Sequence, residues 1–346
     1  TSTSLHDTPW RDRKRPLWLL SLAVPGLVAA GPVLAEWLQH PAWLWAPLAL
    51  VYIAQPLLDA WLGEDHGNPP ESCVPALEDE RYYRWITWAI VPLLWLGFVF
   101  GAWYASTRAL PLHAWLALAL STGVVGGFCI NAGHELGHKK SRFEQWLAQL
   151  VLAPTAYGHF VMEHNRGHHR DVATFADPAS ARMGESIWRF VRREWPGAWK
   201  RAWALERARL LQLGRHPIGL GNQILVTGAL TLAFWAALSL WLGPAVLPFL
   251  LIAAAWANFQ LSSANYIEHY GLKRRSDADG RPERCRPCHS WNSNSLLSNW
   301  VLFHLQRHAD HHAHAARRYQ SLRHFAEAPQ LPTGYFGMFL LAYVPP

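Results

Sequence analysis

The stretch that decides the fold is LHAWLALALSTGVVGGFCINA at residues 112–132, which runs almost directly into HELGHKK at residues 134–140. The first part is 21 residues long and carries no charge, enough for a helix to cross the hydrocarbon core of a bilayer. The second part places two histidines four residues apart, on one face of a helix. The stretch therefore predicts a membrane-spanning helix that ends in side chains suited to bind a metal ion.

Five further windows are apolar and about as long, and the six together predict an all-α integral membrane bundle. The predicted transmembrane helices are residues 17–38, 42–62, 85–105, 112–132, 218–242 and 245–267. An N-terminal arm at 1–16, an insertion at 139–217 and a C-terminal region at 273–346 remain outside them, and we expect the last two to form a helical cap. A soluble all-α protein is the alternative, but six windows of full spanning length disfavour it.

The basic residues are distributed on one side of this predicted topology. Of 31 Lys and Arg residues, Arg108 alone falls on the other side. Because cytoplasmic loops carry the excess of basic residues, both termini and the cap are predicted to be cytoplasmic. The same topology accounts for the net charge of +7, so the charge does not indicate nucleic-acid binding.

The composition excludes two other classes of protein. A hydrophobic content of 51% excludes disorder, and four Cys in 346 residues exclude a disulfide scaffold. The 19 His cannot be explained by packing alone. Nine of them form clusters with metal-ligand spacing: His134, His138, His164, His168, His169, His269, His308, His311 and His312.

The spacing within these clusters predicts two metal ions. His164 and His168 are expected to share a helix face, with His169 turned by about 100° from His168. His308 is expected to lie between the directions of His311 and His312. The side chains of adjacent histidines on a helix point in different directions, so such a pair suits two neighbouring ions better than one. Since one ion takes at most about six ligands, nine histidines imply two.

Neutral imidazoles do not balance the charge of two divalent ions, so nearby carboxylates are expected to orient the rings. The candidates are Glu135, Glu163, Asp171, Glu268 and Asp310. The HELGH sequence by itself also matches the HExxH pattern of zinc proteases, in which a glutamate acts as base.

Four motifs carry a resemblance to a known family. HELGHKK at 134–140, EHNRGHHRDVAT at 163–174, NYIEHYGL at 265–272 and LQRHADHHAHAARRYQSL at 305–322 closely resemble the alkane 1-monooxygenases, the histidine-rich diiron alkane hydroxylases of bacterial membranes. The resemblance implies six transmembrane helices in the inner membrane and a cytoplasmic diiron site whose ligands are the nine clustered histidines. It also implies O2 as co-substrate and terminal hydroxylation of medium-chain alkanes.

The resemblance further implies rubredoxin as electron donor, reduced in turn by an NAD(P)H-dependent rubredoxin reductase. Rubredoxin iron needs two CxxC pairs, whereas Cys285 and Cys288 form the only pair in the chain. No electron-transfer domain is therefore expected within these residues, and the chain is not expected to bind flavin or nucleotide. The role of the two cysteines stays open, as does a fused rubredoxin after Pro346.

An alkane dissolves in the bilayer, so the spans are expected to enclose a channel that leads to the metal site. Val51, near the middle of the second predicted span, is a candidate lining residue, and replacing it with Trp is expected to shorten the preferred chain. A fatty-acid desaturase or an alkyl-aromatic methyl hydroxylase is the nearest alternative function. An intramembrane zinc protease and a metal transporter are more distant alternatives.

Overall fold

The computed structural model describes residues 10–344, and in these residues the regular structure is helical, with isolated bridges between extended residues. Six helices are long and apolar enough to cross a membrane, which confirms the predicted all-α membrane bundle. They are called spans 1 to 6: Arg15–Trp37, Pro41–Leu62, Arg81–Thr107, Leu112–Gly137, Gln223–Leu242 and Pro244–His269. Residues 1–9 of the predicted N-terminal arm lie outside the described residues.

The six spans differ in how regular their helices are. Span 1 includes α1 (Leu27–Trp37), and span 2 includes α2 (Ala46–Ala49), a π-helical turn at Leu50–Ala54 and α3 (Gln55–Leu62). Spans 3, 4 and 5 are α5, α6 and α11, and span 6 consists mainly of α12 (Leu247–His269). The helices outside the spans are α4 (Val74–Asp79), α7 (Arg142–Leu152), α8 (Phe160–Glu163), α9 (His169–Asp171), α10 (Ile187–Gln212), α13 (Leu296–Val301), α14 (His308–Ala313) and α15 (Tyr335–Tyr343).

Spans 4 and 6 pack against each other at the centre of the bundle, because glycines on α6 allow a close approach. A Cβ atom added to Gly123 would lie 2.7 Å from the carbonyl oxygen of Ala253, and one added to Gly127 would lie 2.6 Å from Cβ of Gln260. Small residues at such positions let two membrane helices meet at backbone distance. The contact brings the ends of α6 and α12, which carry His134 and His269, to the same end of the bundle.

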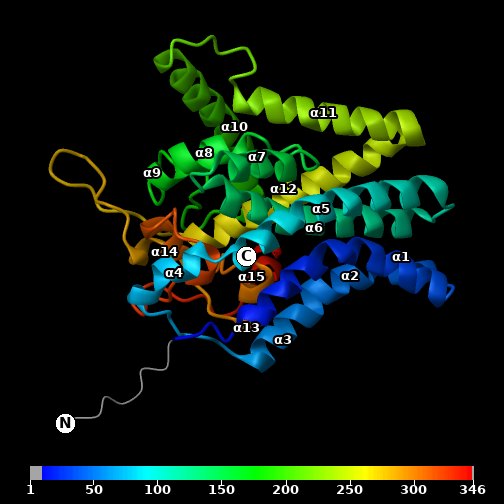
Figure 1. Cartoon of the computed structure of the whole chain (residues 1–346), viewed down its shortest axis with the longest axis horizontal. Helices are drawn as coiled ribbons and strands as arrows, with labels where there is room; N and C mark the ends of the chain where they lie inside the picture. Colours follow the sequence, from blue (N-terminus) through cyan, green and yellow to red (C-terminus); the bar gives the residue numbers. More distant parts are fainter. Residues whose placement is uncertain (1–9, 345–346) are drawn as a thin grey trace.

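The short helices gather at that same end. Figure 1 shows α9, α13 and α14 on one side, while the far ends of α1, α5 and α11 project to the other. Charge pairs mark the two ends: Arg15 pairs with Glu80 at the histidine end, and Arg108 pairs with Glu36 at the opposite end. Arg108 is the basic residue that the sequence placed apart from the others.

The last helix, α15, lies inside the bundle. It contacts α12 of span 6 and both α3 and the π-helical turn of span 2. One face of α15 presents the buried Tyr335, Phe336 and Phe339, while Leu341 on another face is exposed. The C-terminal region therefore supplies part of the interior as well as part of the cap.

Candidate metal centre

The nine clustered histidines come from four separate segments and meet in one place. His134 lies in the last turn of α6, and His138 follows directly after that helix. His269 is the last residue of α12. The other six belong to two short helical segments of the cap: His164, His168 and His169 to the first, and His308, His311 and His312 to the second.

The rings divide into two groups, each with ring nitrogens within 4.8 Å of one another. The five-ring group consists of His134, His138, His164, His169 and His311. The four-ring group consists of His168, His269, His308 and His312. Each group has enough rings to hold one metal ion, and the binding of two ions stays a prediction.

The predicted pair His164 and His168 shares a face, but its two rings belong to different groups. The rings stack with centroids 5.1 Å apart, while His164 belongs to the five-ring group and His168 to the four-ring group. The reason is the π-helical turn at residues 164–168. The wider turn brings His169 under His164 as well, with their Nε2 atoms 3.1 Å apart, and so joins His164 to His169 in the five-ring group. Single π-helical turns of this kind are frequent at functional sites.

Helix α14 divides its histidines in a similar way, but with ordinary helical spacing. His308 and His312, four residues apart, place their Nε2 atoms 2.9 Å from each other in the four-ring group. His311 points to the five-ring group, where its Nε2 lies 2.8 Å from that of His134. Adjacent histidines thus face different groups in both cap segments, as the sequence predicted.

The donor set fits metal ions. Buried ring nitrogens face one another, and Nε2 of His138 and Nε2 of His168 have no hydrogen-bond partner among the described residues. Burial lowers the pKa of His164, His311 and His312 well below the usual value for histidine. These imidazoles are therefore neutral near pH 7 and present lone pairs, which is the form that binds divalent first-row metals.

The four-ring group is held by a carboxylate that the sequence analysis did not single out. Asp177 accepts a hydrogen bond from Nδ1 of His168 at 2.9 Å, and both side chains are fully buried. Ser180 and Arg201 also donate to Asp177. Although burial opposes the charged imidazole, the carboxylate of Asp177 raises the pKa of His168. Asp177 lies in a loop, eight residues after His169, so no helical spacing connects it with the histidines.

Two further contacts hold the same group. Nδ1 of His269 lies 3.2 Å from the carbonyl oxygen of His289, and an oxygen of Glu268 lies 3.3 Å from Nε2 of His308. The other oxygen of Glu268 accepts a hydrogen bond from the hydroxyl of Tyr335 at 2.8 Å. The carbonyl oxygen at Nδ1 of His269 fixes the direction of that ring and leaves its Nε2 free to bind an ion, whereas Glu268 lies against Nε2 of His308, the nitrogen that faces the other rings.

Of the five carboxylates predicted to orient rings, Glu268 alone contacts a predicted ligand. Glu135 pairs with Lys139 at 3.0 Å, and Asp310 pairs with His314, which belongs to neither group. Glu163 and Asp171 both pair with Arg201. Because Arg201 also binds Asp177, these two carboxylates reach His168 through two intermediates. Closeness to the histidine motifs in the sequence therefore selected acidic residues near the site, but four of the five pair with residues other than the predicted ligands.

Comparison with known proteins assigns the family. The profile of the fatty acid desaturase family matches residues 109–342. Alkane 1-monooxygenase 1 of Alcanivorax borkumensis is 52% identical over 334 residues, which cover 96% of this chain and 83% of that protein. Alkane 1-monooxygenase of Pseudomonas putida is 50% identical over 349 residues, covering 99% of this chain and 86% of that protein.

The chain belongs to the alkane 1-monooxygenase family. A weaker similarity connects it to the hydroxylase component of xylene/toluene monooxygenase from Pseudomonas putida, 29% identical over 67% of this chain and 60% of that protein. The difference in identity separates the alkane enzymes from the alkyl-aromatic enzyme, which was one of the alternatives that the sequence left open.

In this alkane 1-monooxygenase family member an apolar cavity leads away from the histidines. It lies between α6, α12 and α15, and its lining includes Val124, Asn131, Gln260, Tyr335 and Phe339. Asn131 is one turn before His134, and Tyr335 bonds to Glu268. The cavity therefore starts beside the predicted ligands and follows the two central spans into the bundle.

Val51 lies close to this cavity but not in its lining. The side chain is 1% exposed and packs in the same apolar cluster as the cavity residues Phe128, Phe336 and Phe339. The role predicted for Val51 in chain-length selection stays a prediction.

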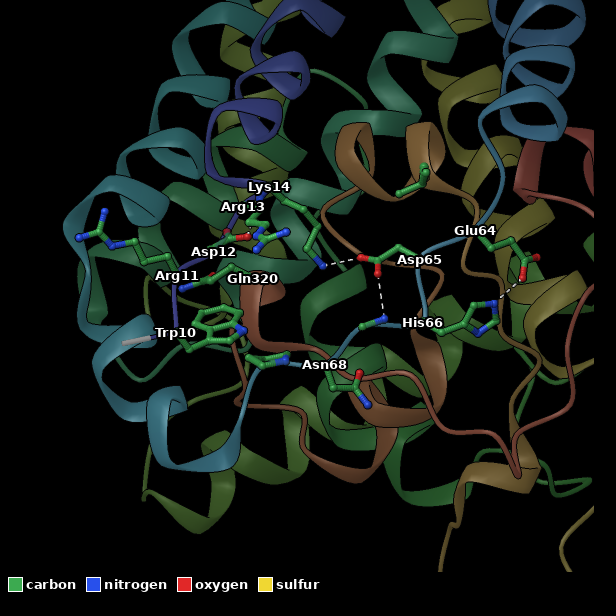
Figure 2. Close-up of a pocket in the computed structure, with 13 residues that line it drawn as sticks. Trp10, Arg11, Asp12, Arg13, Lys14, Glu64, Asp65, His66, Asn68 and Gln320 are labelled. Carbon is green, nitrogen blue, oxygen red and sulfur yellow. Dashed lines mark hydrogen bonds and ion pairs between the residues drawn. The ribbon is translucent and has the colours of Figure 1, made fainter. Parts of the chain in front are cut away.

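A separate polar pocket lies beside the N-terminal arm. Figure 2 shows Lys14 directed at Asp65 and His66 directed at Glu64, with Trp10 on the opposite wall. Behind this pocket the fully buried Arg307 donates to the carbonyl oxygens of Asp65 and Leu322, each at 2.8 Å. Since Arg307 precedes His308, these bonds anchor the start of α14 to the loop that follows span 2.

Proposed function

We propose that the protein hydroxylates the terminal methyl group of medium-chain alkanes at two iron ions, one in each histidine group. The observation that carries this proposal is the division of nine imidazoles, six of them buried, into two groups at the end of an apolar cavity. Membership of the alkane 1-monooxygenase family supports both the substrate class and the reaction.

The ligand set supports iron in preference to the chemistry of a zinc protease. Imidazole suits several first-row metals, and two adjacent all-histidine groups exceed what a single zinc ion requires. An alkane carbon has no acidic proton and no electrophilic centre, so acid–base or nucleophilic chemistry cannot attack it. When bound, the two iron ions supply the O2-dependent oxidation that such a bond needs.

The chain itself contributes substrate binding and the exclusion of water. The cavity walls are mostly apolar and disfavour water, and the cavity, which encloses about 30 Å³ in this structure, has to widen to admit a hydrocarbon chain. Asn131 and Tyr335 lie at the end of the cavity nearest the histidines. At this end, one terminal methyl group of the alkane would be held close to the two histidine groups. The hydroxyl of Tyr335 donates a hydrogen bond to Glu268, and Glu268 in turn contacts His308. These contacts fix the position of the cavity wall at Tyr335 relative to His308.

We further propose that rubredoxin docks where the histidine cluster reaches the surface. His138, His169 and His312 are partly exposed, whereas the other six predicted ligands are buried. The exposed Arg166 and Arg170 lie beside this opening in the sequence of the second motif. Positive charges there suit a small acidic redox protein and would speed its association at low salt. Donor turnover that does not change with ionic strength would contradict this steering.

The membrane orientation is part of the same proposal. We place the histidine end and both termini on the cytoplasmic face of a bacterial inner membrane. Thirty of 31 basic residues lie toward that side of the predicted topology, and Arg108 is at the opposite end of the bundle. A cytoplasmic site would give a reduced donor direct access to the exposed imidazole edges.

The decisive experiment is a reaction of the purified chain in lipid nanodiscs with octane. The protein is loaded with ferrous iron, and reduced rubredoxin and isotopically labelled O2 are supplied. We expect 1-octanol that carries one labelled oxygen atom, together with two iron ions per chain. An octene product would instead support a desaturase, and exclusive turnover of xylene would support an alkyl-aromatic hydroxylase. Activity that persists without O2 would contradict every one of these oxidations.

A further inference from the structure

A second polar cluster lies deep in the bundle, away from the histidines. The hydroxyl of Tyr52 donates to the side-chain oxygen of Gln260 at 2.6 Å, and the side-chain nitrogen of Gln260 lies 3.4 Å from the hydroxyl of Tyr343. Ser263 lies 3.0 Å from the same hydroxyl. The cluster joins span 2, span 6 and α15, which also pack through apolar side chains.

The position of this cluster follows from the way α15 runs along α12. Tyr335, at the start of α15, pairs with Glu268, whereas Tyr343, at its end, pairs with Ser263. The two helices are therefore antiparallel, and Tyr343 lies farther from the histidines than Tyr335. Gln260 precedes Glu268 by two turns, so the cluster lies about 12 Å deeper than Glu268 at 1.5 Å per helical residue.

The cavity reaches the same depth. Its lining begins at Asn131 and Tyr335 and extends to Val124 on α6 and Gln260 on α12. Val124 is seven residues before Asn131, which is about 10 Å along a helix. Gln260 is thus both a wall residue at the deep end of the cavity and the central member of the polar cluster.

The polar atoms of Gln260 require an explanation, because burying an amide in apolar surroundings costs free energy unless it is hydrogen-bonded. Gln260 is buried, and Gly127 of α6 presses against its Cβ and Cγ. The amide is thereby directed toward Tyr52 and Tyr343. An apolar side chain would fill the space without this cost, so packing alone does not account for a glutamine here.

We propose that Tyr52, Gln260 and Tyr343 form a hydrogen-bonded latch that closes the deep end of the cavity and sets the longest alkane that it accepts. The inference rests on the proposed alkane hydroxylation. Loss of one tyrosine hydroxyl leaves one of the two polar atoms of the Gln260 amide without its tyrosine partner and weakens the contact between span 2 and α15. The ring contacts of Tyr52 with Phe336 and with Tyr343, whose centroids are 6.2 and 6.4 Å apart, then remain as apolar packing between span 2 and α15.

The test uses Tyr343→Phe and Tyr52→Phe, each of which removes a hydroxyl and keeps the ring. The variants and the unchanged protein convert a mixture of octane, dodecane and hexadecane in nanodiscs, and the 1-alkanols are quantified. We expect the ratio of hexadecane to octane products to rise at least about fourfold. Burial of one further methylene group is worth about 0.8 kcal/mol, which corresponds to that factor.

The matched control is Tyr104→Phe. Its hydroxyl donates to Glu36 at the opposite end of the bundle, so the product ratio should stay unchanged. The double variant Tyr52→Phe/Tyr343→Phe should change the ratio by less than the product of the single effects, because both act on one latch. A ratio that stays the same in both single variants, or an equal loss for every chain length, would overturn the proposal.

Ligand-induced stabilisation gives a second readout that does not depend on turnover. The Tm of each protein is measured in nanodiscs with octane or hexadecane added, and Gln260→Met serves as a third latch variant. Latch variants should gain more stabilisation from hexadecane than the unchanged protein does. If the unchanged protein makes no 1-alkanol, the proposed function fails, whereas equal stabilisation of all proteins by hexadecane would refute the latch.

Discussion

The two histidine groups are built from the same side chain but supported differently. In the four-ring group, Asp177, Glu268 and the carbonyl oxygen of His289 contact three of the four residues. In the five-ring group the contacts among the described residues are mainly between the rings themselves, such as His134 with His311 and His164 with His169. Two of the five rings, His138 and His169, reach the surface, compared with one ring, His312, in the four-ring group.

This difference indicates that the two groups bind their ions with different rigidity and affinity. Rings with fixed hydrogen-bond partners keep their direction when no ion is bound, whereas rings held by one another are set by the ion. The four-ring group is therefore expected to be the more rigid and more tightly binding site. The five-ring group is expected to exchange its ion more readily and to lie closer to the electron donor.

The largest expected effect is the loss of a predicted ligand, and it should differ between the groups. His308→Ala leaves three rings in its group, while His138→Ala leaves four in the other. We expect His308→Ala to lose one iron per chain and more than a hundredfold in activity, since changes to outer partners alone typically cost 10–100-fold. His138→Ala should retain more iron. Elemental analysis and octane turnover test this order, and equal iron loss in both variants would break the comparison.

The next effect concerns the support of the four-ring group. Asp177→Asn removes the charge opposite His168 and should weaken iron binding in that group by about 10–100-fold. The matched control is Asp171→Asn, because Asp171 also pairs with Arg201 but contacts no predicted ligand. A titration with iron, monitored by spectroscopy, measures the iron affinity of both variants. If the two variants bind iron alike, Asp177 does not orient His168.

Removal of the metal should proceed in two phases. A chelator is expected to extract the ion of the five-ring group first, because His138 and His169 are partly exposed and have no carboxylate partner. The ion of the four-ring group should leave several times more slowly. Stopped samples analysed for iron and activity follow the two phases, and a single phase would show that the groups release their ions together.

The smallest expected effect concerns the π-helical turn. A Cβ atom at Gly167 would lie 2.7 Å from Nε of Arg201, which three carboxylates hold in place. Gly167→Ala should therefore cost about 1–3 kcal/mol and lower the Tm by a few degrees. Gly228→Ala, in a helix where an added Cβ atom meets nothing within 4 Å, should be nearly neutral. A similar Tm in both variants would show that Arg201 yields to the added methyl group.

Much of the fold and of the candidate site could be predicted from the sequence. Uncharged windows of spanning length predict six helices, because hydrocarbon accepts long apolar segments only as helices or closed barrels. Adjacent histidines such as His168–His169 predict two directions on a helix, and the structure has two groups. These inferences depend on length, charge and local spacing, which the sequence contains directly.

The remaining features depend on contacts between segments distant in the chain. Asp177 and Tyr335 carry no local pattern that connects them to His168 or Glu268, so spacing did not identify them. The pairing of His164 with His169 depends on a π-helical turn, which packing against Arg201 and the neighbouring helices accommodates. One wall of the cavity is formed by α15, whose position between spans 2 and 6 no hydropathy pattern predicts.

The sequence by itself therefore determined the number of spans, the side with the basic residues and the nine candidate ligands. The tertiary structure decided which histidines share a group, which carboxylate supports them and which helix walls the cavity. The physical reason is range: hydrophobicity and helical period act over a few residues, while hydrogen bonds such as that between Asp177 and His168 depend on how the whole chain packs.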